Sequence, residues 1–157
     1  MYKLFSREDL EFPFPSDPGR LIGDTVTPIV LQAVTVPIGK TAAIAKNLLR
    51  STREALFQAV EQCKPGKRIG DISVAVQKHV EADGFSVIRT LVGHGVGRNM
   101  HEDPQIPNYG TPGTGAELET GMVLAVEPMV NAGNHPVRMG EDSWAIYSQD
   151  GSLAAHF

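Results

Sequence analysis

Two histidines and one glutamate stand out in this chain because their side chains can bind metal ions and transfer protons. His94 and His101 lie seven residues apart in the glycine-rich stretch Gly93–Gly110. Glu127 interrupts the apolar run Leu124–Met129, and a carboxylate in such a run is costly to bury unless it is paired or bound to a cation. Imidazole and carboxylate groups together suit Zn, Mn, Fe or Co. The pattern therefore predicts a divalent metal site.

A simpler interpretation of the same stretch is a glycine-rich turn that carries two incidental surface histidines. A lone histidine would favour that interpretation. Here residues 85–92, rich in β-branched side chains, are typical of a strand. Glycines after a strand free the backbone at its end, where open sites are commonly built. Together with Glu127, this favours the metal site.

Two helices should help to position these groups. Apolar residues recur at helical spacing through residues 41–64, and Pro65-Gly66 ends that pattern. A second helix is predicted from Asp71, a suitable N-cap, to the stop at Asp83-Gly84.

Residues 87–92 of the strand-like stretch named above and three further segments, residues 122–130, 143–148 and 152–157, are predicted to be the strands of a sheet. The last two should form a hairpin, because the Asp150-Gly151 step between them is a strong turn signal. We expect one curved, mainly antiparallel sheet with the helices packed on one face, which is an α+β fold.

The composition narrows the range of partners. A chain of 157 residues can bury a sizeable core as one domain, and its net charge of −4 argues against nucleic acid and membrane surfaces as partners. The sequence shows neither a bilayer-spanning apolar run nor a secretory signal at its start. Cys63 is the single cysteine. It lies on the apolar stripe of the first predicted helix and is therefore predicted to be buried in the protein core. A chain without an internal disulfide fits the cytoplasm.

The motifs also resemble those of a known family. Gly93–Gly110, followed by Gly121–Met129, is similar to the type I methionine aminopeptidases, which are dimetal hydrolases with the pita-bread fold. The likeness runs from about Gly23 to Phe157. It implies a partial pita-bread catalytic domain over residues 20–157, shorter than the intact fold, preceded by an arm of no recognised family over residues 1–19.

The resemblance also implies roles for individual residues. His94 would be a metal ligand, and Glu127 a second ligand that also takes part in proton transfer. His101 would contact the substrate carbonyl and the tetrahedral intermediate. Trp144 falls where the family carries an aromatic residue near the substrate pocket. The implied substrate is the N-terminus of a peptide or nascent chain.

The remaining ligands of the family align less completely. Gly23-Asp24-Thr25 resembles the motif that carries a bridging aspartate, so Asp24 would be a metal ligand. Counting back from Gly39 by family spacing puts Leu31 there instead. In the Asp24 register, Pro13 occupies the place of the other aspartate, and the family's bridging glutamate would directly follow Phe157. The family binds two divalent ions per chain; zero or one is expected here.

Three functions are consistent with this sequence. The first is a metal-dependent aminopeptidase that removes N-terminal methionine, with impaired activity because ligands are missing. The second is a non-catalytic pita-bread relative or fragment that acts as a binding module. The third is a hydrolase with one ion held by His94, Glu127 and Asp24. Core surface left exposed by the missing half would also allow an oligomer.

Overall fold

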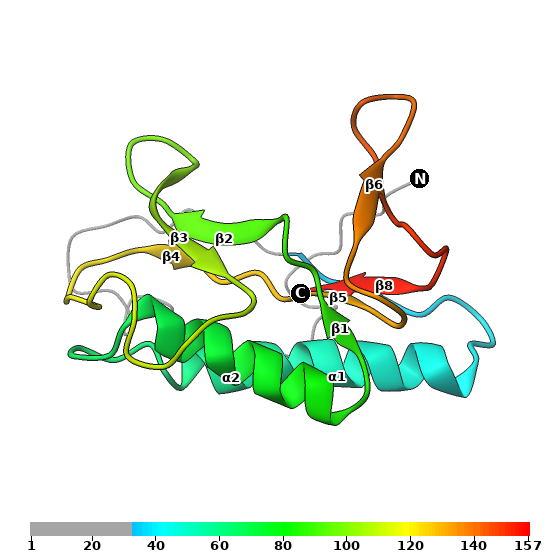
Figure 1. Ribbon diagram of the computed structural model, residues 1–157, viewed down its shortest axis with the longest axis horizontal. Coiled ribbons are helices and arrows are strands. Elements are labelled where there is room, and N and C mark those ends of the chain that lie inside the picture. The colour runs from blue at the N-terminus through cyan, green and yellow to red at the C-terminus, as the bar shows by residue number, and fades with distance from the viewer. Residues whose placement is uncertain (1–32) are drawn as a thin grey trace. The chain divides into compact units, whose positions relative to one another are not determined.

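The computed structural model describes residues 33–157, which all belong to one structural unit, Leu31–Phe157. The predicted arm over residues 1–19, the boundary at residue 20, and Asp24 with its alternative Leu31 lie outside the described residues. Two helices, α1 (Ala43–Val60) and α2 (Ile69–Ala82), pack side by side along one edge of the ribbon in Figure 1, and eight short strands lie on one side of them. Neither helix has the length and apolar character that a bilayer crossing requires.

Helix α1 buries one face, and some apolar residues of the predicted stripe, such as Ile44 and Val60, remain exposed. The buried positions are Leu48, Ser51, Thr52, Ala55 and Ala59. Most of these side chains are small, which lets α1 approach its neighbours closely, and the Thr52 hydroxyl donates to the Leu48 carbonyl and so needs no other partner.

The prediction that Cys63 lies in the core is wrong. Regular helix stops at Val60, and two tight turns carry the chain on to Pro65. The helical projection that placed Cys63 on the apolar stripe therefore no longer applies, and the residue is exposed.

Helix α2 begins two residues before Asp71, which had been predicted as its N-cap. Arg68 occupies the cap position, and its backbone N–H donates to Asp71 Oδ2 at 2.9 Å. The other carboxylate oxygen of Asp71 accepts from the Gly113 N–H at 2.9 Å. These two hydrogen bonds lower the pKa of Asp71. Asp71 thus stabilises the helix start from its first turn, as the glutamate of a capping box does.

The strands form three small sheets, so the expected single sheet is wrong. Their bounds are β1 Ser86–Val87, β2 Val92–Gly95, β3 Glu102–Pro107, β4 Leu124–Ala125, β5 Met129–Asn131, β6 Val137–Met139, β7 Ile146–Ser148 and β8 Ala154–His156. The orders are β1-β5-β8, β3-β2-β4 and β6-β7, and all the pairings are antiparallel.

Pro128 explains one of these breaks. The predicted strand over residues 122–130 is divided into β4 and β5, and Pro128 lies between them. Proline has no N–H to donate to a ladder, so pairing stops there and resumes in another sheet. Glu127 consequently lies at the changeover between the sheet β3-β2-β4 and the sheet β1-β5-β8.

The predicted hairpin over residues 143–157 is also incorrect in its pairing. The chain does turn at Gly151, which has a φ of +74°, but β7 pairs with β6 and β8 pairs with β5. Asp150 accepts hydrogen bonds from the backbone N–H groups of Asn134 and Ser152, which ties the turn to another loop. Hydrogen bonds of this kind lower the pKa of Asp150 to about 2.

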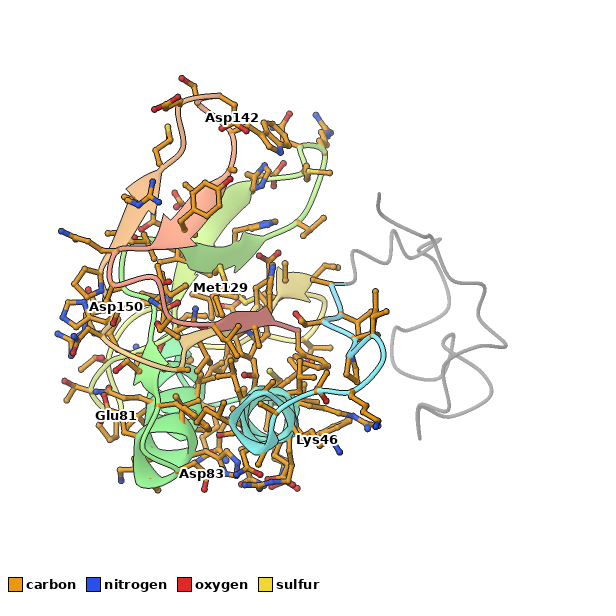
Figure 2. All side chains as sticks on the ribbon, turned by 90° about the vertical axis from the view of Figure 1, so that its right-hand side faces the viewer. Lys46, Glu81, Asp83, Met129, Asp142 and Asp150 are labelled. Atoms are coloured by element: carbon orange, nitrogen blue, oxygen red, sulfur yellow. The ribbon has the colours of Figure 1, made fainter. Side chains whose placement is uncertain are left out.

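The core lies between the helices and the sheet β1-β5-β8. Both helices contact this sheet, α2 through β1 and α1 through β5 and β8. The largest fully buried apolar side chains are Leu48, Ile72, Val76, Val80, Val87 and Val130. The β6-β7 ribbon stands apart from this core: in Figure 2, Asp142 at its tip lies at the opposite end from Asp83 beside the helices. The architecture is the α+β arrangement predicted, with helices on one face.

Candidate metal and substrate site

Glycines make room for the strand that carries His94. In β2 the ladder pairs His94 with Gln105 of β3 and Ala125 of β4. A Cβ atom at Gly93 would run into the Ala125 carbonyl oxygen, and one at Gly95 into that of Asp103. The register shifts between His94 and Gly95, and such bulges re-aim side chains near functional sites. His94 therefore lies within a strand, near its end, rather than in the loop that follows.

The His94 ring is buried and oriented by the backbone. The residue is 7% exposed, and its Nδ1 lies 2.9 Å from the Gly95 carbonyl oxygen. A carbonyl can only accept, so Nδ1 carries a proton, and Nε2 is the ring nitrogen left to bind a cation. This is the arrangement in which metal-binding histidines are usually held.

Glu127 lies opposite that nitrogen. His94 Nε2 is 3.5 Å from Glu127 Oε1, and His156 Nε2 is 3.6 Å from Glu127 Oε2. The nearby His156 imidazole lowers the pKa of Glu127 most, and the imidazoles of His94 and His101 lower it further, against the opposing effect of partial burial. The carboxylate is therefore ionised, and it faces a lone pair unless a proton or a cation lies between them.

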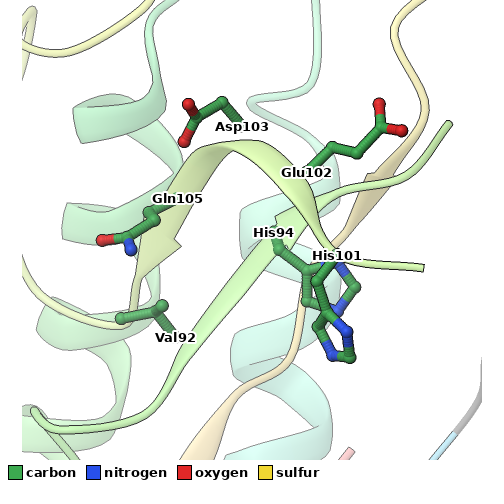
Figure 3. A pocket seen from close by; sticks show the side chains of 6 residues that line it. All are labelled: Val92, His94, His101, Glu102, Asp103 and Gln105. Atoms are coloured by element: carbon green, nitrogen blue, oxygen red, sulfur yellow. The ribbon is translucent and has the colours of Figure 1, made fainter. Parts of the chain in front are cut away.

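The His101 ring lies against that of His94 in a tilted orientation. Their ring centroids are 4.2 Å apart with planes at 49°. The turn before β3 is closed by Glu102, whose Oε1 accepts from the Asn99 N–H at 2.7 Å. Figure 3 shows the two imidazoles together, with the carboxylates of Glu102 and Asp103 pointing away from them.

An open hollow of about 520 Å³ borders the two histidines. Its lining residues are Val92, His94, His101, Glu102, Asp103 and Gln105. The hollow gives a ligand access to the exposed His101 and to the edge of His94.

The predicted site residues are not all brought together. His94, His101 and Glu127 converge as expected, well within the roughly 8 Å that sharing one ion allows. Trp144 lies in the loop between β6 and β7, 87% exposed, and does not line the hollow. Its backbone N–H donates to Asp142 Oδ1.

His156 is the contact that sequence reasoning missed. Residues 152–157 had been paired with the preceding strand, which put His156 opposite the wrong partner. In the structure β8 pairs with β5, with Met129 and His156 in register, so the imidazole lies beside Glu127. No spacing in the sequence signals this, because the residues are brought together only by the strand order.

The donor set at Glu127 fits a divalent cation. Two imidazole nitrogens face one ionised carboxylate, and His156 Nε2 is buried without a hydrogen bond of ordinary length. His94 and Glu127 could hold the cation directly.

A second group of potential ligands lies between the helices. Glu54, His79 and Asp83 have ligand atoms within 4.8 Å of one another. Arg50 already donates to both carboxylates, at 2.6 Å to Glu54 and 3.0 Å to Asp83. The positive charge that an ion would supply is thus present already.

Comparison with known proteins identifies the family to which this fold belongs. Residues 29–148 match metallopeptidase family M24. Methionine aminopeptidase 1 of Bacillus subtilis is 50% identical over 126 residues, 80% of this chain and 51% of that protein. The methionine aminopeptidase of Clostridium perfringens is 47% identical over 125 residues, 80% of this chain and 50% of that protein.

A solved structure gives the same result. The methionine aminopeptidase of Thermotoga maritima superposes with a TM-score of 0.78 at 56% identity, over 79% of this chain and 50% of that one. The fold is therefore pita-bread-like, as expected. The chain spans about half the length of the relatives it matches. From the extent of the family match and these identities, we conclude that the chain belongs to metallopeptidase family M24.

Proposed function

We propose that this chain belongs to a metal-dependent aminopeptidase that removes methionine from the N-termini of peptides or nascent chains. The observation that carries the proposal is the approach of His94 Nε2 to Glu127 Oε1, 3.5 Å, with the His101 ring 4.2 Å from that of His94. His94 of this pair and the exposed His101 both line the open hollow. The cytoplasm, where nascent chains emerge, is the compartment that this function implies.

A bound divalent cation, Co, Mn, Fe or Zn, would polarise the scissile carbonyl and provide hydroxide near neutral pH. His94 is held as the tautomer that presents Nε2 to such an ion. Glu127 is ionised, so it can both bind the ion and carry a proton toward the leaving amine. Asp24 is a further ligand in this proposal.

His101 would stabilise the oxygen on which negative charge develops. Its side chain is exposed at the hollow, beside the buried His94 ring. A single donor aimed at such an oxygen can be worth about 3 kcal/mol of transition-state stabilisation. Trp144 enters the proposal as an apolar surface that a bound peptide could cover, since its indole is 87% exposed.

We expect one ion at most and slow turnover from this polypeptide. A dimetal centre needs carboxylates that bridge two cations about 3.5–4 Å apart. Among the described residues Glu127 is the carboxylate that faces His94, so a second ion would have few ligands there. This observation favours a second candidate function, a non-catalytic pita-bread relative that acts as a binding module.

Metal content and methionine release separate the two candidates. The protein would be loaded with Mn, Co, Fe or Zn in turn, bound metal measured, and release of methionine from Met-initiated peptides assayed beside His94→Ala. Metal-dependent release that the variant lacks supports the aminopeptidase. Bound metal without release, or no metal, would leave the binding module.

A further inference from the structure

The carboxylate of Glu127 lies between two imidazoles, one at each oxygen. His94 Nε2 is 3.5 Å from Oε1, and His156 Nε2 is 3.6 Å from Oε2. The two imidazoles differ in whether a further hydrogen bond orients the ring. The His94 ring is oriented by its own hydrogen bond to Gly95, whereas His156 Nε2 is buried and has Glu127 as its near polar neighbour.

The backbone of His156 is fixed from both sides. The Thr35 hydroxyl donates to the His156 carbonyl at 3.0 Å and accepts from the His156 N–H at 2.9 Å. On the other edge His156 is in register with Met129, and the Phe157 N–H donates to the Pro128 carbonyl at 3.2 Å. Strand β8 is therefore held directly beside the residues that follow Glu127.

We infer that His156 is a positioning residue for Glu127: its Nε2–H holds Oε2, so that Oε1 stays directed at the cation position beside His94. The inference rests on the proposed function. A glutamate side chain that is free to rotate loses conformational entropy when it binds an ion. A hydrogen bond that fixes one oxygen beforehand reduces that loss, and removing such a partner from a metal ligand typically weakens metal affinity about 10- to 100-fold.

The 3.6 Å separation is compatible with this role. It is slightly longer than an ordinary hydrogen bond, and contacts at reactive sites often tighten when the ligand binds. A small rotation of either side chain would shorten the distance between His156 Nε2 and Glu127 Oε2, and the hydrogen-bonded backbone of His156 need not move.

The test is Mn²⁺ affinity by titration calorimetry, with His156→Ala and His156→Gln. A glutamine keeps an N–H donor in a side chain of similar reach. We expect Ala at position 156 to weaken Mn²⁺ binding about 10- to 100-fold and Gln to recover most of the loss. His135→Gln, at an exposed turn, is the matched control and should bind as the unmodified chain does. Thermal unfolding without metal establishes that each variant is folded.

Two results would overturn the inference while the proposed function stands. Unchanged Mn²⁺ affinity in both variants would mean that His156 does not hold Glu127. An equal loss of Mn²⁺ affinity in His156→Ala and His156→Gln, with both variants folded, would mean that the imidazole binds the ion directly. An unmodified chain that binds no Mn²⁺ would overturn both proposals together.

Discussion

Two pairs of histidine and glutamate in this molecule have almost the same geometry and quite different surroundings. His94 and Glu127 are 3.5 Å apart at the sheets, and His79 and Glu54 are 3.3 Å apart between the helices. The side chains of the first pair are 9% and 28% exposed, those of the second 27% and 44%. Arg50 joins the second pair, and no arginine or lysine forms an ion pair with the first among the described side chains.

The difference indicates which pair is suited to an ion. Spacing alone would assign a metal to either. A guanidinium at 2.6 Å from Glu54 supplies positive charge where the side chains are well hydrated, and exposed pairs of this kind contribute little to stability. Among the described residues, imidazoles are the groups that pair with Glu127, in a less hydrated position where electrostatic attraction is stronger. A cation therefore gains more at the sheets.

Neutralising Glu127 should have the largest effect. We expect Glu127→Gln to weaken Mn²⁺ binding at least about 100-fold, since the amide removes the negative charge that holds the ion. Glu54→Gln, the matched change at the helices, should leave Mn²⁺ affinity unchanged. Calorimetric titration of both variants provides the comparison. If the two changes cost the same affinity, the sheets hold no preferred site.

Removing Arg50 should make the two pairs more alike. In Arg50→Met, Glu54 and Asp83 lose their shared cation, so we expect a new, weak Zn²⁺ site with His79. The ion pairs are exposed, so the free energy of unfolding should fall by less than about 1 kcal/mol. Zn²⁺ titration would show the added binding event. Its absence would mean that Glu54, His79 and Asp83 are not arranged to hold an ion even when vacated.

Low pH should reduce the stability of the metal-free fold, because Glu127 becomes protonated. The pKa of Glu127 is lowered in the folded chain, first by the nearby His156 imidazole and then by those of His94 and His101. A depressed carboxyl pKa stabilises the fold above the unfolded value, near 4.5, and that contribution is lost as the pH falls through the folded pKa.

The expected result is a Tm that drops below about pH 4.5 in the unmodified chain and drops less in Glu127→Gln. Glu119→Gln, at an exposed position, serves as the control and should follow the unmodified curve. Parallel curves for all three proteins would show that Glu127 does not contribute. The effect should amount to a few degrees, because Glu127 remains partly hydrated.

Trp144→Ala should have the smallest effect on the folded chain. The indole is 87% exposed on the β6–β7 loop, and surface changes of this kind usually alter stability by less than about 0.5 kcal/mol. Mn²⁺ affinity should also be unchanged. Under the proposed function, the change appears as a higher KM for Met-initiated peptides with kcat retained. Weaker metal binding in this variant would show that the loop supports the site.

The sequence predicted which residues of the candidate site lie together better than it predicted the sheets that hold them. The approach of His94 to Glu127 was expected from side-chain chemistry and motif, and these depend on local residues. The helices followed from apolar spacing. Sheet order is not local: nothing in residues 122–130 says that the two sides of Pro128 join different sheets, although the missing N–H of proline indicates where the break falls.

Errors elsewhere have the same origin. Cys63 was placed by extending a helical projection past the last regular turn. Asp71 was correctly expected near a helix start. An aspartate can accept backbone hydrogen bonds there either from the N-cap position or from the first turn, so residue type alone did not fix which position it occupies. His156 was not considered because its contact with Glu127 depends on β8 crossing to β5.

The two hydrogen bonds between the Thr35 hydroxyl and the His156 backbone have a consequence for when the candidate site forms during folding. It joins residues 121 positions apart, and contacts between such distant residues form only after the intervening chain has been arranged, because loop closure costs entropy in advance. While the polypeptide is being synthesised, His94 and Glu127 emerge before His156 does. A growing chain would therefore have a loosely held Glu127 carboxylate until β8 docks, and under the proposed function the cation position would be completed only by that docking.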